Sequence, residues 1–127
     1  MAPHRAPSML EDPLAIRVSD AISRLYLDRF GKGPLQAETV ICDDLVVTLL
    51  REVSTPAERA MIEAGKQDSV LTTRILWQHS TDLLFRAGVA HVTGREVLVS
   101  ISGFEIEHDM ASEVFVLAPL SVASTIC

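Results

Sequence analysis

The four residues Gly31-Lys32-Gly33-Pro34 restrict the fold more than any other segment of the chain. The two glycines permit positive φ angles, and Pro34 disfavours helical geometry at Gly33 while lacking an amide donor of its own. We therefore expect no helix to cross this segment. It divides the 127-residue chain into a short first part and a longer second part.

The first part predicts a helix from Asp12 to Arg29. Its apolar residues recur at intervals of three and four, which places them on one face of a helix: Leu14, Val18, Ala21, Ile22 and Leu25. Gly31 supplies a residue that can adopt the left-handed conformation at the end of this helix.

The second part opens with two runs that favour strands, Glu38 to Cys42 and Leu45 to Arg51. The two residues between them, Asp43 and Asp44, are tolerant of turns, so the pair is expected to form a hairpin.

A helix start follows at Thr55-Pro56-Ala57-Glu58. Thr55 can cap the helix, proline suits its first position, and Glu58 can reach back to the cap amide. We expect this helix to run to about Ala87 and to stop at Gly88, and Gly65 leaves open a break or bend within it.

The last part predicts a second hairpin. Val97, Val99 and Ile101 alternate within Glu96 to Ser102, which predicts that these three side chains form a buried face. Gly103 is a candidate bulge. A second strand, Glu113 to Leu117, follows a polar turn.

These elements predict an α+β fold in the order helix, hairpin, helix, hairpin, with one four-stranded antiparallel sheet and the helices on one of its faces. We expect a disordered lead-in at 1–10, a single domain at 11–120 and a tail at 121–127. A sheet with one uncovered face often dimerises, so a homodimer is expected.

The net charge of −6 argues against a nucleic-acid-binding module, because phosphate contacts need a basic face. The two cysteines are too few for a disulfide framework or a four-cysteine zinc site. With no apolar run long enough to span a bilayer and no signal peptide, we expect a cytoplasmic protein with no direct membrane insertion.

Two acidic groups could bind a cation. Asp43 and Asp44 could do so together with Glu38, but a solvated turn explains the two aspartates better. A second acidic stretch holds Glu105, Glu107, His108 and Asp109. A charged edge that guards against aggregation is the favoured interpretation, so no metal site is predicted.

The basic residues near the glycine turn suggest a binding site for a small ligand or an anion. Gly33 and Lys32 could clamp an anion or a nucleic-acid backbone, although a tight helix-to-strand turn is the favoured interpretation. The candidate pocket lies between the long helix and the sheet, near Arg29, Lys32 and Arg95.

No catalytic constellation is evident. His91 could serve as a general base, but no motif around a serine, cysteine or aspartate marks a nucleophile. We therefore expect a chain that is not an enzyme and that needs no cofactor.

Four segments together resemble the MpsC-type family, named for a component of a proposed sodium-translocating, membrane-potential-generating system. They are the runs 30–34, 41–47 and 54–58 and the pair Thr93-Gly94, and the resemblance covers roughly Val18 to Leu117. It departs from the expected pattern in the weakly charged tract Gln67 to Phe85 and in the second hairpin.

The resemblance implies a stand-alone cytosolic domain associated with membrane systems for ion or inorganic-carbon uptake. It carries over no catalytic residue. Our leading hypothesis is an accessory or regulatory protein that binds a membrane-associated partner, linked to ion or bicarbonate transport. The alternatives are a small-ligand or anion sensor and, lower, a nucleic-acid-binding module.

Overall fold

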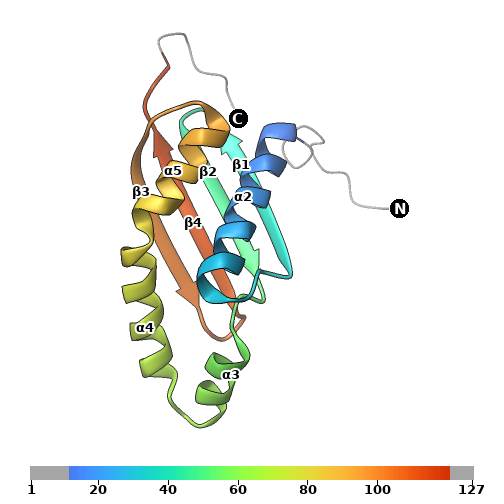
Figure 1. The fold of residues 1–127 in the computed structure, drawn as a ribbon, viewed down its shortest axis with the longest axis vertical. Helices are drawn as coiled ribbons and strands as arrows, with labels where there is room; N and C mark the ends of the chain where they lie inside the picture. Colours follow the sequence, from blue (N-terminus) through green and yellow to red (C-terminus); the bar gives the residue numbers. More distant parts are fainter. Residues whose placement is uncertain (1–11, 121–127) are drawn as a thin grey trace, which may run out of the picture.

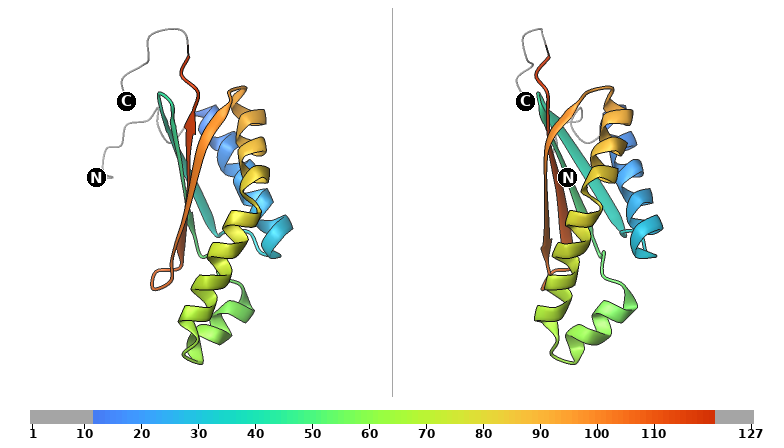
Figure 2. Two further views of the ribbon diagram at one scale, coloured as in Figure 1. Left: turned by 90° about the vertical axis from the view of Figure 1, so that its left-hand side faces the viewer. Right: turned by 60° about the vertical axis from the view of Figure 1, so that its left-hand side comes forward.

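The computed structural model describes residues 12–120, so the expected lead-in at 1–10 and tail at 121–127 lie outside the described residues. Within this range the fold is α+β, as predicted: helices cover one face of a four-stranded antiparallel sheet of order β1-β2-β4-β3 (Figures 1 and 2). The elements are α2 (Pro13–Phe30), β1 (Gln36–Cys42), β2 (Leu45–Arg51), α3 (Pro56–Glu63), α4 (Gln67–Ser80), α5 (Asp82–Thr93), β3 (Val97–Glu105) and β4 (Met110–Leu117).

Helix α2 agrees with its prediction to within a residue at each end. Asp12 accepts a hydrogen bond of 2.9 Å from the backbone N–H of Leu14, and Pro13 opens the first turn. The helix ends at Gly31, whose φ of 78° is in the left-handed region. Its buried face lies on the sheet and consists of Ala15, Val18, Ser19, Ile22 and Tyr26.

The first hairpin is also confirmed. Cys42 pairs with Leu45, and the register continues regularly to Gln36 opposite Arg51. Asp43 takes the positive φ of 55° that the two-residue turn requires, a conformation that aspartate tolerates better than most residues.

The single long helix expected between Thr55 and Ala87 is wrong, and the break that the sequence left open at Gly65 is present. Thr55 and Glu58 form the predicted capping box, but α3 ends at Glu63 and Gly65 turns the chain with a φ of 81°. A second interruption at Thr81 separates α4 from α5.

The expected stop at Gly88 is also wrong, because this glycine lies inside α5 and Gly94 ends the helix. A Cβ atom at Gly88 would lie 3.2 Å from Cδ1 of Leu25. The glycine therefore permits the close packing of α5 on α2.

The second hairpin forms and Val97 packs against the core as predicted, but along the rest of β3 the predicted buried face is reversed. Ser100, Ser102 and Phe104 pair with Phe115, Glu113 and Ala111, the β4 residues buried against the helices. Val99 and Ile101 consequently lie on the opposite face. The irregularity in register falls between Val97 and Val99, and Gly103 pairs regularly with Ser112, so the predicted bulge at Gly103 is wrong.

The core lies between the sheet and helices α2 and α5. It contains Val18, Ile22, Tyr26, Val46, Leu50, Val53, Phe85, Val89, Ala111, Phe115 and Leu117. Tyr26 meets Phe85 edge-on, with ring centroids 5.6 Å apart.

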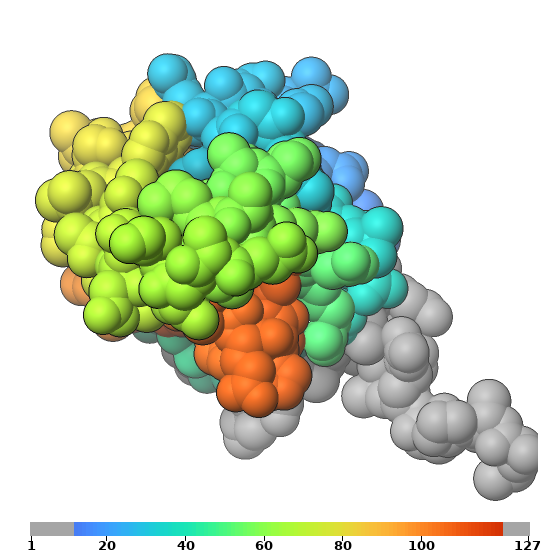
Figure 3. All heavy atoms as spheres, turned by 90° about the horizontal axis from the view of Figure 1, so that it is seen from below, coloured from blue at the N-terminus to red at the C-terminus, as the bar shows by residue number. Residues whose placement is uncertain are grey.

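Helix α3 and the start of α4 reach beyond the lower ends of the strands (Figure 1). There α3 lies beside the tip of the β3–β4 hairpin (Figure 3). Asp109, at that tip, accepts hydrogen bonds from the backbone N–H and the hydroxyl of Ser54, at 2.9 and 2.6 Å. The second hairpin thus holds the segment that leads into α3.

Candidate functional site

One face of the sheet is left uncovered by residues 12–120, and most of the side chains on it are apolar. In residues 12–120 all helices lie on the other face (Figure 2). Alternation along each strand and the pairing register define this surface, which we call the open face. Its apolar residues are Val40, Leu45, Val47, Leu49, Val99, Ile101, Val114 and Val116.

Three of these side chains are strongly exposed within the described part of the chain. The exposed fraction is 59% for Ile101, 41% for Val99 and 40% for Leu45. Monomeric soluble proteins rarely present contiguous apolar patches of this kind, which more often mark an interaction site.

The lower end of the open face is hollowed. A groove of about 540 Å³ is lined by Leu49, Gly103, Phe104, Glu105, His108, Met110, Ala111 and Ser112. A Cβ atom at Gly103 would lie only 3.0 Å from Oγ of Ser112, so a larger side chain at Gly103 would crowd Ser112. Arg51 and Glu38 form an exposed ion pair of 3.9 Å at the same end.

Beneath the helices lies a buried ion pair. The side chain of Arg74 on α4 is wholly buried, and its Nε and Nη2 each lie 2.7 Å from an oxygen of Glu58. Nη2 also donates to the carbonyl of Val53. The guanidinium lies over the rings of Phe30 and Phe104, at 4.3 and 4.9 Å.

Burial opposes ionisation of Glu58, yet hydrogen bonds from Arg74 and from Thr55 hold its pKa below the ordinary value. Within the described residues, Nη1 of Arg74 has no hydrogen-bond partner. The pair therefore anchors α4 to the N-terminus of α3, and one of its donors remains unused.

A second buried acid lies on the helix side of the sheet. Glu113 on β4 is 3% exposed and accepts hydrogen bonds from the hydroxyls of Tyr26, at 2.7 Å, and Ser102. Burial raises the pKa of Glu113 to about 7, although both donors lower it. Burial likewise raises the pKa of Tyr26, which stays protonated and donates.

The six predicted site residues fall into two groups at opposite ends of the sheet. Lys32 donates to the carbonyls of Glu52 and Gly33, just beyond the lower end of β2. Arg95 donates to the carbonyl of Asp43 at 2.9 Å and to Oδ1 of Asp44 at 2.6 Å, at the other end of that strand. The cations Lys32 and Arg95 therefore do not share a pocket.

Each group has a structural role. Arg95 also donates to the carbonyl of Ala118, so it ties the first hairpin turn to the end of β4. Because Asp44 is paired with Arg95, a cation site at Asp43 and Asp44 gains no support. Arg29 lines a separate pocket of about 200 Å³ together with Phe30, Thr55, Glu58, Thr73, Arg74 and Trp77.

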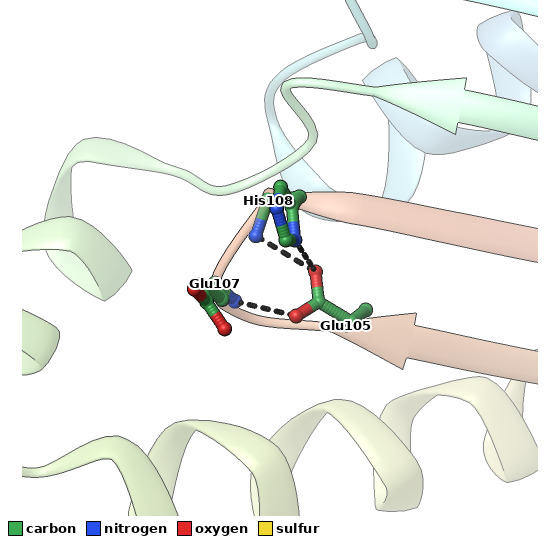
Figure 4. Close-up of side chains that lie close together, drawn as sticks. All are labelled: Glu105, Glu107 and His108. Atoms are coloured by element: carbon green, nitrogen blue, oxygen red, sulfur yellow. Dashed lines mark hydrogen bonds and ion pairs between the residues drawn. The ribbon is translucent and has the colours of Figure 1, made fainter.

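The acidic stretch around Glu105 stabilises a turn. Glu105 accepts hydrogen bonds from the backbone N–H groups of Glu107, at 3.2 Å, and His108, at 2.7 Å (Figure 4). The His108 backbone bond is the main reason that the pKa of Glu105 lies below its ordinary value. Ligand atoms of Glu105, Glu107 and His108 lie within 4.8 Å of one another, but all three residues are exposed and Glu105 is already engaged.

Sequence reasoning missed both buried charges. Glu113 sits at a helix-facing position of β4, between Ala111 and Phe115, where the alternating pattern marked it as inward-facing. Arg74 occupies the same face of α4 as Val70 and Gln78, at intervals of four. In both cases the available signal was a charged residue at a position that the strand or helix periodicity assigns to the buried face.

The comparisons identify one relationship. A family model described as "Na+-translocating membrane potential-generating system (MpsC)" matches residues 12–119. Searches of curated proteins and of solved structures found no match. No helix among residues 12–120 is both long and apolar enough to cross a bilayer. The match spans most of the chain, and the protein therefore belongs to the MpsC family.

Proposed function

We propose that this chain is a non-catalytic accessory module of a membrane ion-transport system and that it acts as a cytoplasmic homodimer. The family description supports the link to sodium translocation. The open face supports the dimer, because Leu45, Val99 and Ile101 leave exposed aliphatic side chains on a face that no helix of residues 12–120 covers.

The size of the open face is compatible with a dimer. Four strands about 4.8 Å apart and about seven residues long cover roughly 450 Å² per copy. Two such faces bury about 900 Å² in total, which is in the size range of weak or transient interfaces. Because the patch is aliphatic, each copy offers the other a complementary surface.

The buried polar groups favour a structural role over catalysis. The carboxylates of Glu58 and Glu113 face inward and are engaged by Arg74, Tyr26 and Ser102. A general acid or base must reach a substrate, and these groups instead join helices to the sheet.

Light scattering on the purified chain tests the dimer. We expect a mass near twice 13.9 kDa. Ile101→Lys should shift it to the monomer, since a lysine on the open face cannot be buried in an apolar interface. Leu83→Lys is the matched control, because Leu83 on α5 is 78% exposed and lies on the helical side. A monomeric native chain, or equal shifts in both variants, would refute the dimer.

Sedimentation with membrane vesicles from the source cells tests the accessory role. We expect the chain to sediment with native vesicles and not with protein-free vesicles of the same lipids. Equal recovery with both kinds of vesicle, or with neither, would contradict a membrane-protein partner.

A small-anion sensor is the second candidate, favoured by the pocket that Arg29 lines. Its wall holds two arginines and two threonines against one glutamate, and no group in residues 12–120 accepts a hydrogen bond from Nη1 of Arg74. A thermal-shift series with bicarbonate and phosphate tests this candidate. Stabilisation that Arg29→Gln abolishes would support it, whereas no shift with either anion would exclude those ligands.

A further inference from the structure

The outer edge of β1 borders a groove. β1 is the first strand in the sheet order, so its far side has no strand neighbour among residues 12–120. Helix α2 lies beside this edge and leaves a groove of about 360 Å³. The groove is lined by Ala15, Ile16, Ser19 and Asp20 of α2 and by Gln36, Ala37, Glu38 and Thr39 of β1.

The hairpin geometry fixes which backbone groups face outward. Cys42 and Leu45 close a two-residue turn, and such closing residues form a hydrogen-bonded pair. In an antiparallel ladder these pairs alternate with non-bonded ones. The N–H and C=O groups of Ala37, Thr39 and Ile41 therefore point away from β2, toward the free edge.

The other edge of the sheet is less suited to accept a strand. β3 carries a register irregularity between Val97 and Val99, and bulges of this kind disrupt further pairing. β1 pairs without a register shift over all seven of its residues. Strand addition is therefore favoured at β1.

The charge of this edge indicates the chemistry of its occupant. Asp20 lines the groove from α2, and Glu38 points to the opposite side of β1, so an added strand would have a carboxylate on each side. Glu38 has only a distant, exposed partner in Arg51. A second copy of β1 would bring like charges together, which disfavours it.

We propose that the edge of β1 and the groove beside α2 bind an extended, basic segment of a partner protein by strand addition. Main-chain hydrogen bonds supply affinity in this mode, and lysine or arginine side chains reach Asp20 and Glu38. This proposal rests on the proposed function and adds the chemistry of the partner. Cytoplasmic loops of membrane proteins are enriched in lysine and arginine, so such a loop could supply the basic segment.

A labelled peptide of about ten residues, in which pairs of lysines alternate with pairs of threonines so that both faces of the strand carry lysine, tests this by fluorescence anisotropy with the full chain. We expect saturable binding that weakens at least roughly tenfold at high salt. A peptide with glutamate in place of lysine should not bind. Equal binding of the two peptides would overturn the proposal.

Two variants of equal charge locate the site. Asp20→Asn should weaken lysine-peptide binding about fivefold or more, whereas Asp28→Asn, which alters an exposed residue of α2 outside the groove, should leave it nearly unchanged. Equal weakening by both would mean that only net charge attracts the peptide.

Amide hydrogen exchange identifies the binding mode. The peptide should slow exchange roughly tenfold at Ala37, Thr39 and Ile41 and leave Val40, which already faces β2, unchanged. Unchanged exchange at the three amides would refute strand addition. Because Ile101 lies on β3, at the opposite edge of the sheet from β1, the dimer test can be read separately from this one.

Discussion

The hydroxyl of Tyr26 donates a 2.7 Å hydrogen bond to Oε2 of Glu113, joining α2 to β4 across 87 residues of sequence. Both residues lie in the interior, and Ser102 occupies the other carboxylate oxygen. A carboxyl group in this position makes the stability of the whole fold depend on pH.

Glu113 should make the protein less stable as the pH rises from about 4.5 to about 7. In this window the folded state, with its pKa near 7, holds a proton that the unfolded carboxyl has released. The contribution is fully present below pH 4.5, is lost up to about pH 7 and then stays flat, a total of about 3 kcal/mol. Urea unfolding of the native chain and of Glu113→Gln across this range measures it.

The substituted chain should lose most of that slope, whereas Glu107→Gln at an exposed position should keep it. Parallel pH profiles for the native chain and Glu113→Gln would show that another group titrates.

Removing Glu58 should be costly because it strands the buried guanidinium of Arg74. We expect Glu58→Gln to lower the free energy of unfolding by about 3–5 kcal/mol. The pair of half-exposed Arg59 and Asp109, with a distance of 3.6 Å, provides a comparison, and Arg59→Gln should cost at most about 1 kcal/mol.

Adding Arg74→Met to Glu58→Gln should recover part of the loss, since no unpaired charge then remains buried. A double variant at least as unstable as Glu58→Gln alone would contradict this explanation. Denaturant unfolding of all four proteins provides the comparison.

Arg95 should act through stability and not through anion binding. Arg95→Ala removes three hydrogen bonds, to Asp43, Asp44 and Ala118, and should cost about 2 kcal/mol. Exchange of the Leu117 amide, which donates to the carbonyl of Asp44 at 2.7 Å, should accelerate. Arg24→Ala, at an exposed position of α2, is the control, and an effect of similar size there would argue against a local role.

Gly65→Ala should destabilise the protein by about 1 kcal/mol through backbone strain alone. Its φ is 81°, and no atom lies within 4 Å of the position that a Cβ would occupy. Gly65→Asn should cost less, because asparagine tolerates this conformation. Thermal unfolding distinguishes the two substitutions, and equal costs would indicate that crowding contributes.

Local signals predicted the termini of α2, the first hairpin and the start of α3, because capping and turn formation depend on a few adjacent residues. The interruption at Thr81 was not predictable in this way. There the hydroxyl donates to the carbonyl of Trp77, and no glycine or proline marks the break. At Gly88 the glycine predicted a helix end that does not occur, because its small size instead permits the contact with Leu25.

The reversed face of β3 exposes the limit of hydrophobic patterning. Ser100 and Ser102 face the helices because they donate to Asp82 and Glu113, which leaves Ile101 outside. A pattern that assigns aliphatic residues to the interior cannot anticipate polar partners contributed by other elements. The partners of Lys32, Arg95 and Arg74 also come from elements that are distant in sequence. The structural roles of these three residues could therefore not be predicted from the local pattern.

The stacking of Arg74 between Phe30 and Phe104 also bears on the order of folding. The guanidinium can be buried only after α2, α4 and the β3–β4 hairpin have packed together. An arginine is costly to desolvate before its partners arrive, so docking of α4 belongs late on the folding route. Contacts this distant in sequence are slow to close. Helices α3 and α4, which extend beyond the strands, should therefore be the last elements to pack during folding and the first to unfold.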